Sequence, residues 1–258
     1  MSLRRALLRA VAEAGYRAVR AIAPNAYAQD GLVCVHNHDF MRDPAFERAY
    51  ARGVRALDGE SDYRWHWRIH VGLWAAASAA TLDGDFVECG VNRGFLSSAI
   101  MERLNWDLLG RKFWLLDTFA GLDSRYVSDA ERAAGALERN REELASGFYV
   151  AGARNVVENF AEWKNVRVIV GPVPDTLPRV TAERVAYLHL DMNCAPPEVA
   201  ALEFFWPKLA PGAIVLLDDY AYFGFESQKQ AMDDFATRHG VAICSLPTGQ
   251  GLLLRPPH

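Results

Sequence analysis

From Asp85 onward, the sequence alternates short apolar runs with segments of helical periodicity. This alternation is typical of a parallel sheet covered by helices on both faces. The first five runs are almost continuously apolar, as expected for parallel strands that are buried on both sides. The expected strands are residues 85–89, 112–117, 166–170, 185–191, 213–218, 242–246 and 251–255. The pattern therefore predicts an α/β fold with a doubly wound, seven-stranded sheet.

The last two expected strands are separated by four residues only, from Pro247 to Gln250. Such a connection is too short for a helical crossover, so these strands must form an antiparallel hairpin. Helices are expected at 96–104, 197–209 and 226–239. We expect the second helix to end at Pro211 and Gly212 and the third at Gly240.

Two segments do not belong to this repeat. Residues 1–80 are rich in helical patterns, and residues 3–22 predict an amphipathic helix that packs on its own domain or on a second subunit. A helix lying on a membrane surface is the alternative. Residues 120–164 insert a charged, helix-forming stretch after the second strand, where insertions lie over the ligand crevice. We therefore expect two units. Residues 1–80 form a helix-rich segment that binds substrate, acts as a lid or mediates oligomerisation, and residues 81–258 form the main domain, with residues 120–164 as a lid.

Composition excludes several classes of protein. The chain has 258 residues and a net charge of −4, so no positive field favours nucleic acid or anionic lipid. Its longest nearly uncharged stretch is about a dozen residues, whereas a membrane span needs about twenty. The four cysteines show no CxxC spacing, which predicts reduced thiols in a cytoplasmic protein and gives a zinc cluster no support.

A glycine-containing turn follows the first expected strand, in the order Glu88, Gly90, Asn92, Gly94. Gly90 permits a positive φ and the close approach of a ligand, and the free N–H groups of the next helix can face an anionic group. A dinucleotide fingerprint would require GxGxxG, and Asn92 stands in place of its second glycine. A turn without any ligand stays open as the alternative.

The second expected strand ends in Asp117, followed by Thr118. An acid at this strand tip can accept two hydrogen bonds from ribose hydroxyls. The alternative is that Asp117 caps the next helix or turn. Together with the glycine turn and the terminal hairpin, Asp117 favours a nucleoside cofactor.

The Glu-x-Gly-x-x-x-Gly turn, the acid on the second strand and the antiparallel last strand resemble class I S-adenosylmethionine-dependent methyltransferases, over residues 86–255. Within this class, the segments 117–122 (DTFAGL) and 206–212 (WPKLAPG) look like the macrocin O-methyltransferase (TylF/MycF-type) family. The resemblance implies a Rossmann-like fold, with Val173 packing on the adenine ring. The candidate cofactor-binding residues are Glu88, Gly90, Asn92, Gly94, Asp117, Thr118 and Val173.

Three carboxylates follow two expected strands: Asp191 closes the fourth, and Asp218 and Asp219 close the fifth. Because the carboxyl ends of parallel strands meet at one edge of the sheet, these acids would repel one another unless a cation lay between them. Oxygen-only ligands select Mg²⁺ or another hard divalent cation. The resemblance assigns them the same role, while the alternative is that Asp218 or Asp219 caps the following turn.

The chemistry expected from these residues is transfer of a methyl group from S-adenosylmethionine to a hydroxyl of a small molecule. The resemblance implies a sugar or polyol hydroxyl of a natural product or glycan, and a metal-assisted reaction. Asp191 is the nearest candidate for the general base. Catechol O-methyltransferases place a lysine three residues after the first metal aspartate, and Cys194 occupies that position here.

Three alternatives stay open at this stage. They are a catechol or phenol O-methyltransferase, a non-catalytic module that binds a nucleoside cofactor, and a dehydrogenase, which Asn92 and the terminal hairpin disfavour. The expected partner is a small-molecule acceptor, with a homo-oligomer formed through the N-terminal helices as a further possibility.

Overall fold

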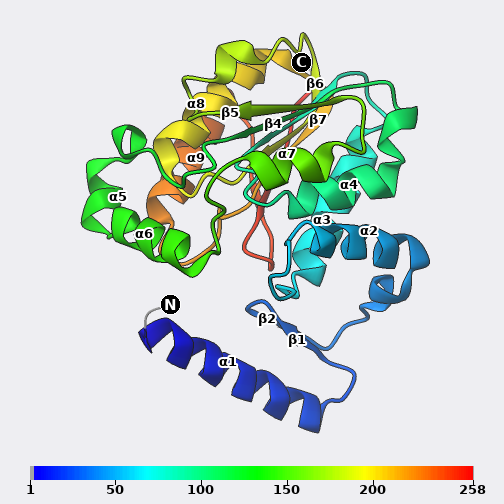
Figure 1. Ribbon diagram of the computed structural model, residues 1–258, viewed down its shortest axis with the longest axis vertical. Coiled ribbons are helices and arrows are strands. Elements are labelled where there is room, and N and C mark those ends of the chain that lie inside the picture. Colours follow the sequence, from blue (N-terminus) through cyan, green and yellow to red (C-terminus); the bar gives the residue numbers. More distant parts are fainter. Residues whose placement is uncertain (1–2, 258) are drawn as a thin grey trace.

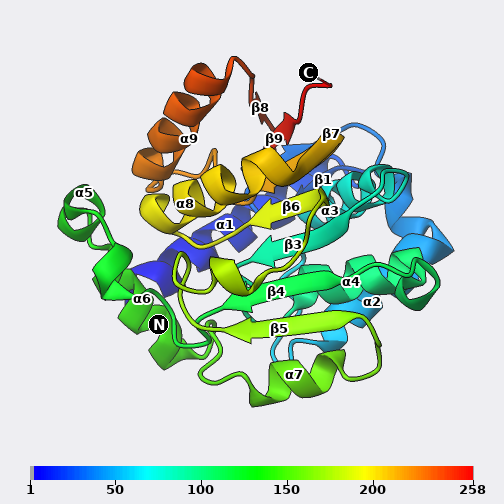
Figure 2. The same ribbon diagram turned by 90° about the horizontal axis from the view of Figure 1, so that it is seen from above.

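A seven-stranded sheet forms the centre of the protein, whose computed structural model describes the backbone of residues 3–257 and the side chains from Ala10 onward (Figure 2). The strand order is β5–β4–β3–β6–β7–β9–β8. The strands are β3 (Asp85–Cys89), β4 (Phe113–Asp117), β5 (Val166–Val170), β6 (Val185–Leu190), β7 (Leu209–Leu217), β8 (Cys244–Ser245) and β9 (Gly251–Leu254). The first five are parallel, and β9 pairs antiparallel with β7 and β8. The predicted fold class is confirmed.

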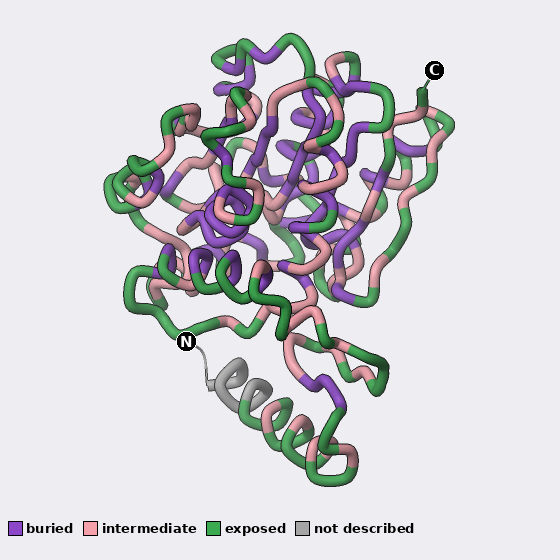
Figure 3. Tube along the Cα trace, turned by 90° about the vertical axis from the view of Figure 1, so that its right-hand side faces the viewer, coloured by how far each residue is buried: buried purple, intermediate pink, exposed green. Residues whose placement is uncertain are grey.

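Helices cover both faces of the sheet because successive strand residues point to opposite sides. Phe86 and Leu115 belong to one buried cluster, and their neighbours Val87 and Leu116 belong to the other. The first cluster includes side chains of α2 (Pro44–Arg55), α3 (His66–Ala79), α4 (Phe95–Leu104) and α7 (Arg154–Phe160). The second includes side chains of α8 (Ala195–Phe205) and α9 (Glu226–His239). Figure 3 shows the accordingly buried interior of the molecule, and β6 is buried along its whole length.

The strand order reverses next to β3, which lies between β4 and β6. Ligands bind at such switch points in open α/β sheets, outside the carboxyl ends of the strands. Backbone hydrogen bonds hold these ends together: Gly90 N–H donates to Leu116 at 2.8 Å and Asp191 N–H to Cys89 at 2.8 Å. The Asp218 N–H donates to the next strand in the same way, at 2.9 Å from the Leu190 carbonyl. The predicted site residues therefore start from neighbouring strand ends.

The helix expected at 197–209 is shorter and begins earlier than predicted. α8 ends at Phe205, a 3₁₀ turn η5 (Trp206–Lys208) follows, and β7 already begins at Leu209. Pro207 has no N–H for an α-helical hydrogen bond, which explains the change of conformation. Pro211 and Gly212, expected to terminate the helix, lie instead in an exposed part of β7.

The N-terminal segment contains a two-stranded ribbon that the sequence pattern did not predict. The elements here are α1 (Leu3–Ile22), β1 (Tyr27–Gln29), β2 (Leu32–Cys34) and a 3₁₀ turn η1 (Asp39–Arg42). α1 stands apart from the sheet and, from Ala10 onward, is exposed or half-buried (Figures 1 and 3). α2 and α3, by contrast, share a hydrophobic cluster with the sheet. The division of the chain near residue 80 stays a prediction.

The insertion after β4 is helical, as its charged pattern indicated. It contains a 3₁₀ turn η3 (Ser124–Tyr126), α5 (Asp129–Ala133), α6 (Ala136–Ser146) and α7, and α5 and α6 project from one side of the sheet. Two further 3₁₀ turns are η2 (Trp106–Leu108) and η4 (Leu177–Arg179). Among residues 3–257, no helix is both long and apolar enough to cross a membrane.

Candidate active site

A cavity of about 520 Å³ lies at the carboxyl ends of the strands. Its wall combines the ends of β3, β4, β6 and β7 with residues of α3, the insertion and the ribbon. Nine predicted site residues line it: Glu88, Gly90, Asn92, Asp117, Thr118, Val173, Asp191, Asp218 and Asp219. Gly94 does not: it precedes α4, and a Cβ there would lie 2.5 Å from the ring of Phe160. Its position indicates helix packing rather than ligand contact.

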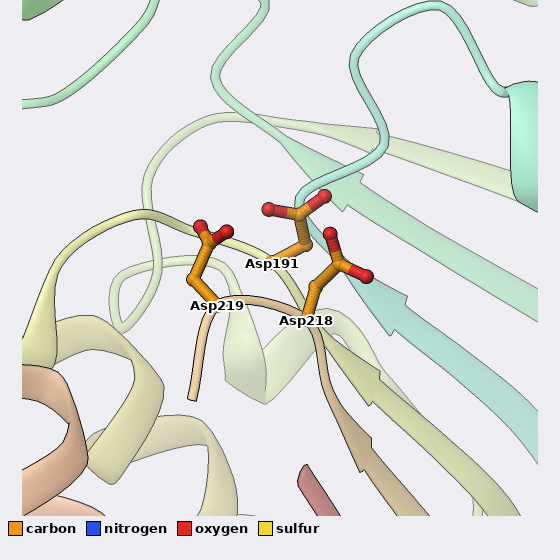
Figure 4. Close-up of side chains that lie close together, drawn as sticks. All are labelled: Asp191, Asp218 and Asp219. Carbon is orange, nitrogen blue, oxygen red and sulfur yellow. The ribbon is translucent and has the colours of Figure 1, made fainter. Parts of the chain in front are cut away.

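The three predicted metal-binding carboxylates converge at the cavity wall. Asp191, Asp218 and Asp219 each offer one oxygen, and these atoms lie within 4.8 Å of one another (Figure 4). Asp218 and Asp219 are buried and Asp191 is half-buried. Three anionic groups at this separation are unstable together unless a positive charge lies near.

Burial and mutual repulsion raise the pKa values of two of these carboxyls. Burial and the neighbouring Asp218 raise the pKa of Asp219 to about 7, and burial with both neighbouring aspartates raises the pKa of Asp191 well above its usual range. Burial would also raise the pKa of Asp218. However, the Arg68 guanidinium, whose Nη1 lies 2.7 Å from Asp218 Oδ2, holds it well below its usual range. The trio therefore contains one carboxylate that stays ionised, Asp218, and two whose ionised forms are destabilised, Asp191 and Asp219.

The trio has carboxylate oxygens without hydrogen-bond partners, which are available to a hard divalent cation. Asp219 Oδ2 is buried and has no hydrogen-bond partner among the described residues. Asp191 accepts one bond, from Asn193 Nδ2 at 3.2 Å. Buried oxygens without partners are costly, and carboxylate oxygens are the ligands that Mg²⁺, Ca²⁺ and Mn²⁺ prefer. These residues could therefore hold such a cation.

A buried histidine links Glu88 to this trio. His189 Nδ1 lies 2.9 Å from Glu88 Oε1, and its Nε2 lies 3.7 Å from Asp218 Oδ1. Burial alone would lower the pKa of His189, but the Asp218 and Glu88 carboxylates raise it to about 10. Gln250 Nε2 also donates to Asp218 Oδ1 at 2.9 Å. These contacts fix the orientation of Asp218, and His189 connects Glu88 to it.

Gly90 brings two strand ends closer than any other residue could. Its φ is +93°, and a Cβ at this position would lie 1.8 Å from the carbonyl oxygen of Asp191. The sequence predicted a close approach of a ligand to Gly90. The structure shows a close approach of another kind, between the turn and the backbone that carries Asp191, and the ligand contact stays a prediction.

The carboxylate of Asp117 is engaged by the glycine turn. Its Oδ2 accepts hydrogen bonds from the N–H groups of Val91 and Asn92 at 2.7 and 2.8 Å, and its Oδ1 accepts from Phe119 N–H at 2.6 Å. Thr118 Oγ1 donates to the Gly121 carbonyl at 2.6 Å. Asp117 therefore stabilises the turn. A ribose hydroxyl could donate only to the lone pairs of Asp117 that these three hydrogen bonds leave free.

The side chain of Asn92 holds the insertion in place. Its Nδ2 donates to the Phe148 carbonyl at 3.0 Å, and its Oδ1 accepts from Val150 N–H at 2.9 Å. Arg93 adds a bond to the Gly147 carbonyl at 2.7 Å. Because Phe148 and Val150 line the cavity, Asn92 connects the glycine turn to the wall formed by the insertion.

Arg68 lines the cavity and was not among the residues predicted from the sequence. It is buried, and its guanidinium lies 4.8 Å from the ring centres of both Trp65 and Tyr222. The two histidines of the same helix pack against aromatic side chains. His66 stacks on Tyr50 at 4.3 Å and His70 on Phe40 at 4.0 Å. No sequence signal singles out Arg68, because its partner Asp218 is 150 residues away.

Glu198, in the first turn of α8, should make the stability of the folded protein depend on pH. Its Oε1 accepts from Met192 N–H at 2.9 Å and from Gln228 Nε2 at 2.7 Å, and burial raises its pKa to about 7 from an ordinary 4.5. A raised carboxyl pKa destabilises the folded state as pH rises from the unfolded to the folded value, after which the effect is constant.

Glu198→Gln should therefore match the wild type in stability near pH 4.5 and exceed it above pH 7, by about 3 kcal/mol at most. The glutamine carbonyl keeps an acceptor for both hydrogen bonds, so only the charge is lost. Urea unfolding of both proteins in EDTA at several pH values measures the difference. A stability difference that does not grow between pH 4.5 and 7 would contradict the assignment.

Comparison with known proteins adds sequence relatives to this geometry. The family model described as Macrocin-O-methyltransferase (TylF) matches residues 73–244, more than half of the chain. The 8-demethyl-8-(2,3-dimethoxy-alpha-L-rhamnosyl)-tetracenomycin-C 4'-O-methyltransferase of Streptomyces olivaceus is 31% identical over 166 residues, covering 62% of this chain and 60% of that protein. Mycinamicin III 3''-O-methyltransferase of Micromonospora griseorubida is 28% identical over 170 residues, covering 62% and 63%. The chain thus spans only about 60% of the length of the curated relatives it matches.

Solved structures share the fold. The O-methyltransferase NovP superposes with a TM-score of 0.63 at 22% identity, covering 73% of this chain and 79% of that one. The calicheamicin methyltransferase CalS11 superposes with a TM-score of 0.60 at 19% identity, covering 85% and 94%. At these identities the likeness concerns the fold alone.

Proposed function

The chain belongs to the macrocin-O-methyltransferase (TylF) family, and on this premise we propose that it transfers a methyl group from S-adenosylmethionine to a sugar hydroxyl of a natural product. One observation carries the proposal: a single cavity joins the glycine turn after β3 to three converging carboxylates. The first feature suits a nucleoside cofactor, and the second suits a hydroxyl that must lose its proton. The Streptomyces olivaceus relative, whose name describes a rhamnosyl compound, supports a sugar acceptor.

The cofactor would lie between the glycine turn and the loop after β5. Gly90 lines the cavity, and Val173, buried at the cavity wall, offers an apolar surface for the adenine ring. Asp117 and Thr118 line the same end of the cavity and would face the ribose. Asn92 contributes indirectly, because its side chain is bonded to the insertion.

The transfer needs the acceptor oxygen to attack the methyl carbon while the carbon–sulfur bond breaks and its electron pair stays on sulfur. We assign Asp191 as the group that takes the hydroxyl proton, since it lines the cavity at the end of β6, beside Asp218 and Asp219. A divalent cation held by Asp191, Asp218 and Asp219 would lower the pKa of the acceptor hydroxyl and orient it. Arg68, His189 and Gln250 hold Asp218 in position.

The catechol alternative receives little support from Cys194, which occupies the position of the lysine. Its thiol is buried and lies 3.2 Å from both the Tyr126 carbonyl and Glu131 Oε2, and burial raises its pKa well above the ordinary range. A thiol in this environment stays protonated and does not act as a base at neutral pH.

Several expectations from the sequence remain part of the proposal. The insertion 120–164 would act as a lid over the acceptor, and residues 1–80 would contribute to substrate binding or to a homo-oligomer. The described cysteines are unpaired, which is compatible with a reaction in the cytoplasm.

The proposed function predicts magnesium-dependent methylation of glycosides. Aryl glycosides of rhamnose and other deoxyhexoses, with catechol beside them, are incubated with S-adenosylmethionine carrying a labelled methyl group. We expect transfer to at least one glycoside in MgCl₂, loss of about 100-fold or more in EDTA, and recovery when Mg²⁺ is restored, because the carboxylates lose their counter-charge.

Each of the other outcomes would favour a different function for this protein. An equal rate in EDTA would contradict the metal site, and labelling of catechol alone would favour the phenol alternative. Calorimetric binding of S-adenosylhomocysteine without transfer to any acceptor would indicate a non-catalytic module.

A further inference from the structure

The turn of the β1–β2 ribbon reaches the candidate active site. Asp30 occupies this turn and is the ribbon residue that lines the cavity. Its φ is +50°, a conformation that aspartate, asparagine and glycine tolerate better than other residues. The ribbon therefore adds one carboxylate to the cavity wall.

The carboxylate of Asp30 is poorly satisfied within the protein. Its side chain is only 16% exposed, and the one ion pair it makes with the described residues joins Oδ2 to Arg68 Nε over 3.7 Å, too long for a hydrogen bond. Arg68 Nε itself has no hydrogen-bond partner among the described residues. Burial raises the pKa of Asp30 to about 6. A mostly buried carboxylate without hydrogen bonds is costly, and donors from a ligand would relieve that cost.

The ribbon holds Asp30 in a defined place. Gly31 N–H donates to Tyr16 Oη at 2.7 Å, and Arg20 Nη1 donates to the Ala28 carbonyl at 2.8 Å, so α1 supports both the turn and β1. On the cavity side, Arg68 lies between Asp30 and Asp218, with Nη1 2.7 Å from the latter. Asp30 is thus one guanidinium group away from a candidate metal ligand.

We propose that Asp30 binds the acceptor, and that its carboxylate accepts a hydrogen bond from a sugar hydroxyl next to the one that is methylated. This inference rests on the proposed function and deepens it by assigning a residue to the acceptor. Sugar hydroxyls are donors that an ionised carboxylate accepts strongly. Adjacent hydroxyls of one ring let the reacting oxygen face the three converging carboxylates while its neighbour faces Asp30. The ribbon and α1 then have a function, which is to present this carboxylate.

Two variants test the assignment without disturbing the backbone. Asp30→Asn removes the charge and Asp30→Gly removes the side chain, and both residues accept the positive φ. Asp83→Asn, at an exposed ion pair with Arg184, serves as the control. The assay uses the best aryl glycoside of the wild-type protein, together with its analogue that lacks the adjacent hydroxyl.

Both Asp30 variants should raise the KM for the glycoside about 10- to 100-fold, the loss expected for a hydrogen bond to a charged group. kcat, the affinity for S-adenosylhomocysteine in MgCl₂ and the control variant should stay within about threefold of the wild type. The deoxy analogue should be a poor substrate of the wild type and should lose little further in Asp30→Gly, because the interaction is already absent.

An unchanged KM in both variants would overturn the inference, as would an equal loss of S-adenosylhomocysteine affinity, which would indicate an effect through Arg68 and the fold. If the wild type methylates no glycoside, the proposed function fails and this inference falls with it. That result is distinguishable, because it appears before any variant is made.

Discussion

Asp219→Asn should lower the rate of methyl transfer in MgCl₂ by about 100-fold or more, while it makes the metal-free protein more stable. Asp219 Oδ2 is buried without a hydrogen-bond partner among the described residues, and the carboxylate lies close to Asp191 and Asp218. This arrangement supports the proposed role of Asp219 in binding a cation. Removing a buried like charge should raise the free energy of unfolding by about 1 to 3 kcal/mol. Turnover in MgCl₂ and urea unfolding in EDTA at pH 8 measure the two effects.

Asp218→Asn is the matched comparison, since it removes a neighbouring carboxylate of the same trio. Asp218 is the counter-charge of the buried Arg68 guanidinium and accepts from Gln250. Its loss should reduce activity and also destabilise the protein by about 3 to 5 kcal/mol, because a buried charge is left unpaired. If Asp219→Asn kept wild-type turnover at limiting Mg²⁺, or if both variants were destabilised equally, the proposed division between the two aspartates would be wrong.

The sheet was predictable because its determinants are local. Continuous apolar runs mark the buried strands, and the four residues from Pro247 to Gln250 leave room only for a hairpin between β8 and β9. The carboxylate trio was predictable for a related reason. Asp191 and Asp218 directly follow two strands, and the parallel order of β6 and β7 brings them to one edge.

Other parts of the site depend on contacts between distant segments. The ribbon carrying Asp30 is two short strands without a strong apolar alternation, and α1 and Arg68 determine where it lies. Asn92 was expected to contact the cofactor, yet its side chain bonds to residues more than 50 positions away. Pro207 changed the end of α8, because a local helical pattern does not reveal where β7 begins to pair. In each case tertiary packing selects among conformations that the local sequence permits.

Gly90→Ala should abolish methyl transfer and destabilise the fold by about 3 kcal/mol or more, which is in the range of severe overpacking. The added methyl group would lie 1.8 Å from the Asp191 carbonyl oxygen and 2.5 Å from its carbonyl carbon. Both are backbone atoms of Asp191, directly after β6, so they cannot move away as a flexible side chain would. The turn and Asp191 must separate, and the Asp191 side chain moves with its backbone.

Gly110→Ala separates this effect from the strain of a positive φ. Gly110 has φ +67°, close in kind to the +93° of Gly90, but a Cβ there would meet no atom within 4 Å. Its replacement should cost about 1 kcal/mol of stability and leave turnover unchanged. Urea unfolding and kcat for both variants give the comparison. Equal losses of stability and kcat in the two variants would mean that backbone strain alone accounts for the effect of Gly90→Ala. The close approach of the Gly90 turn to Asp191 would then not determine the position of the Asp191 side chain.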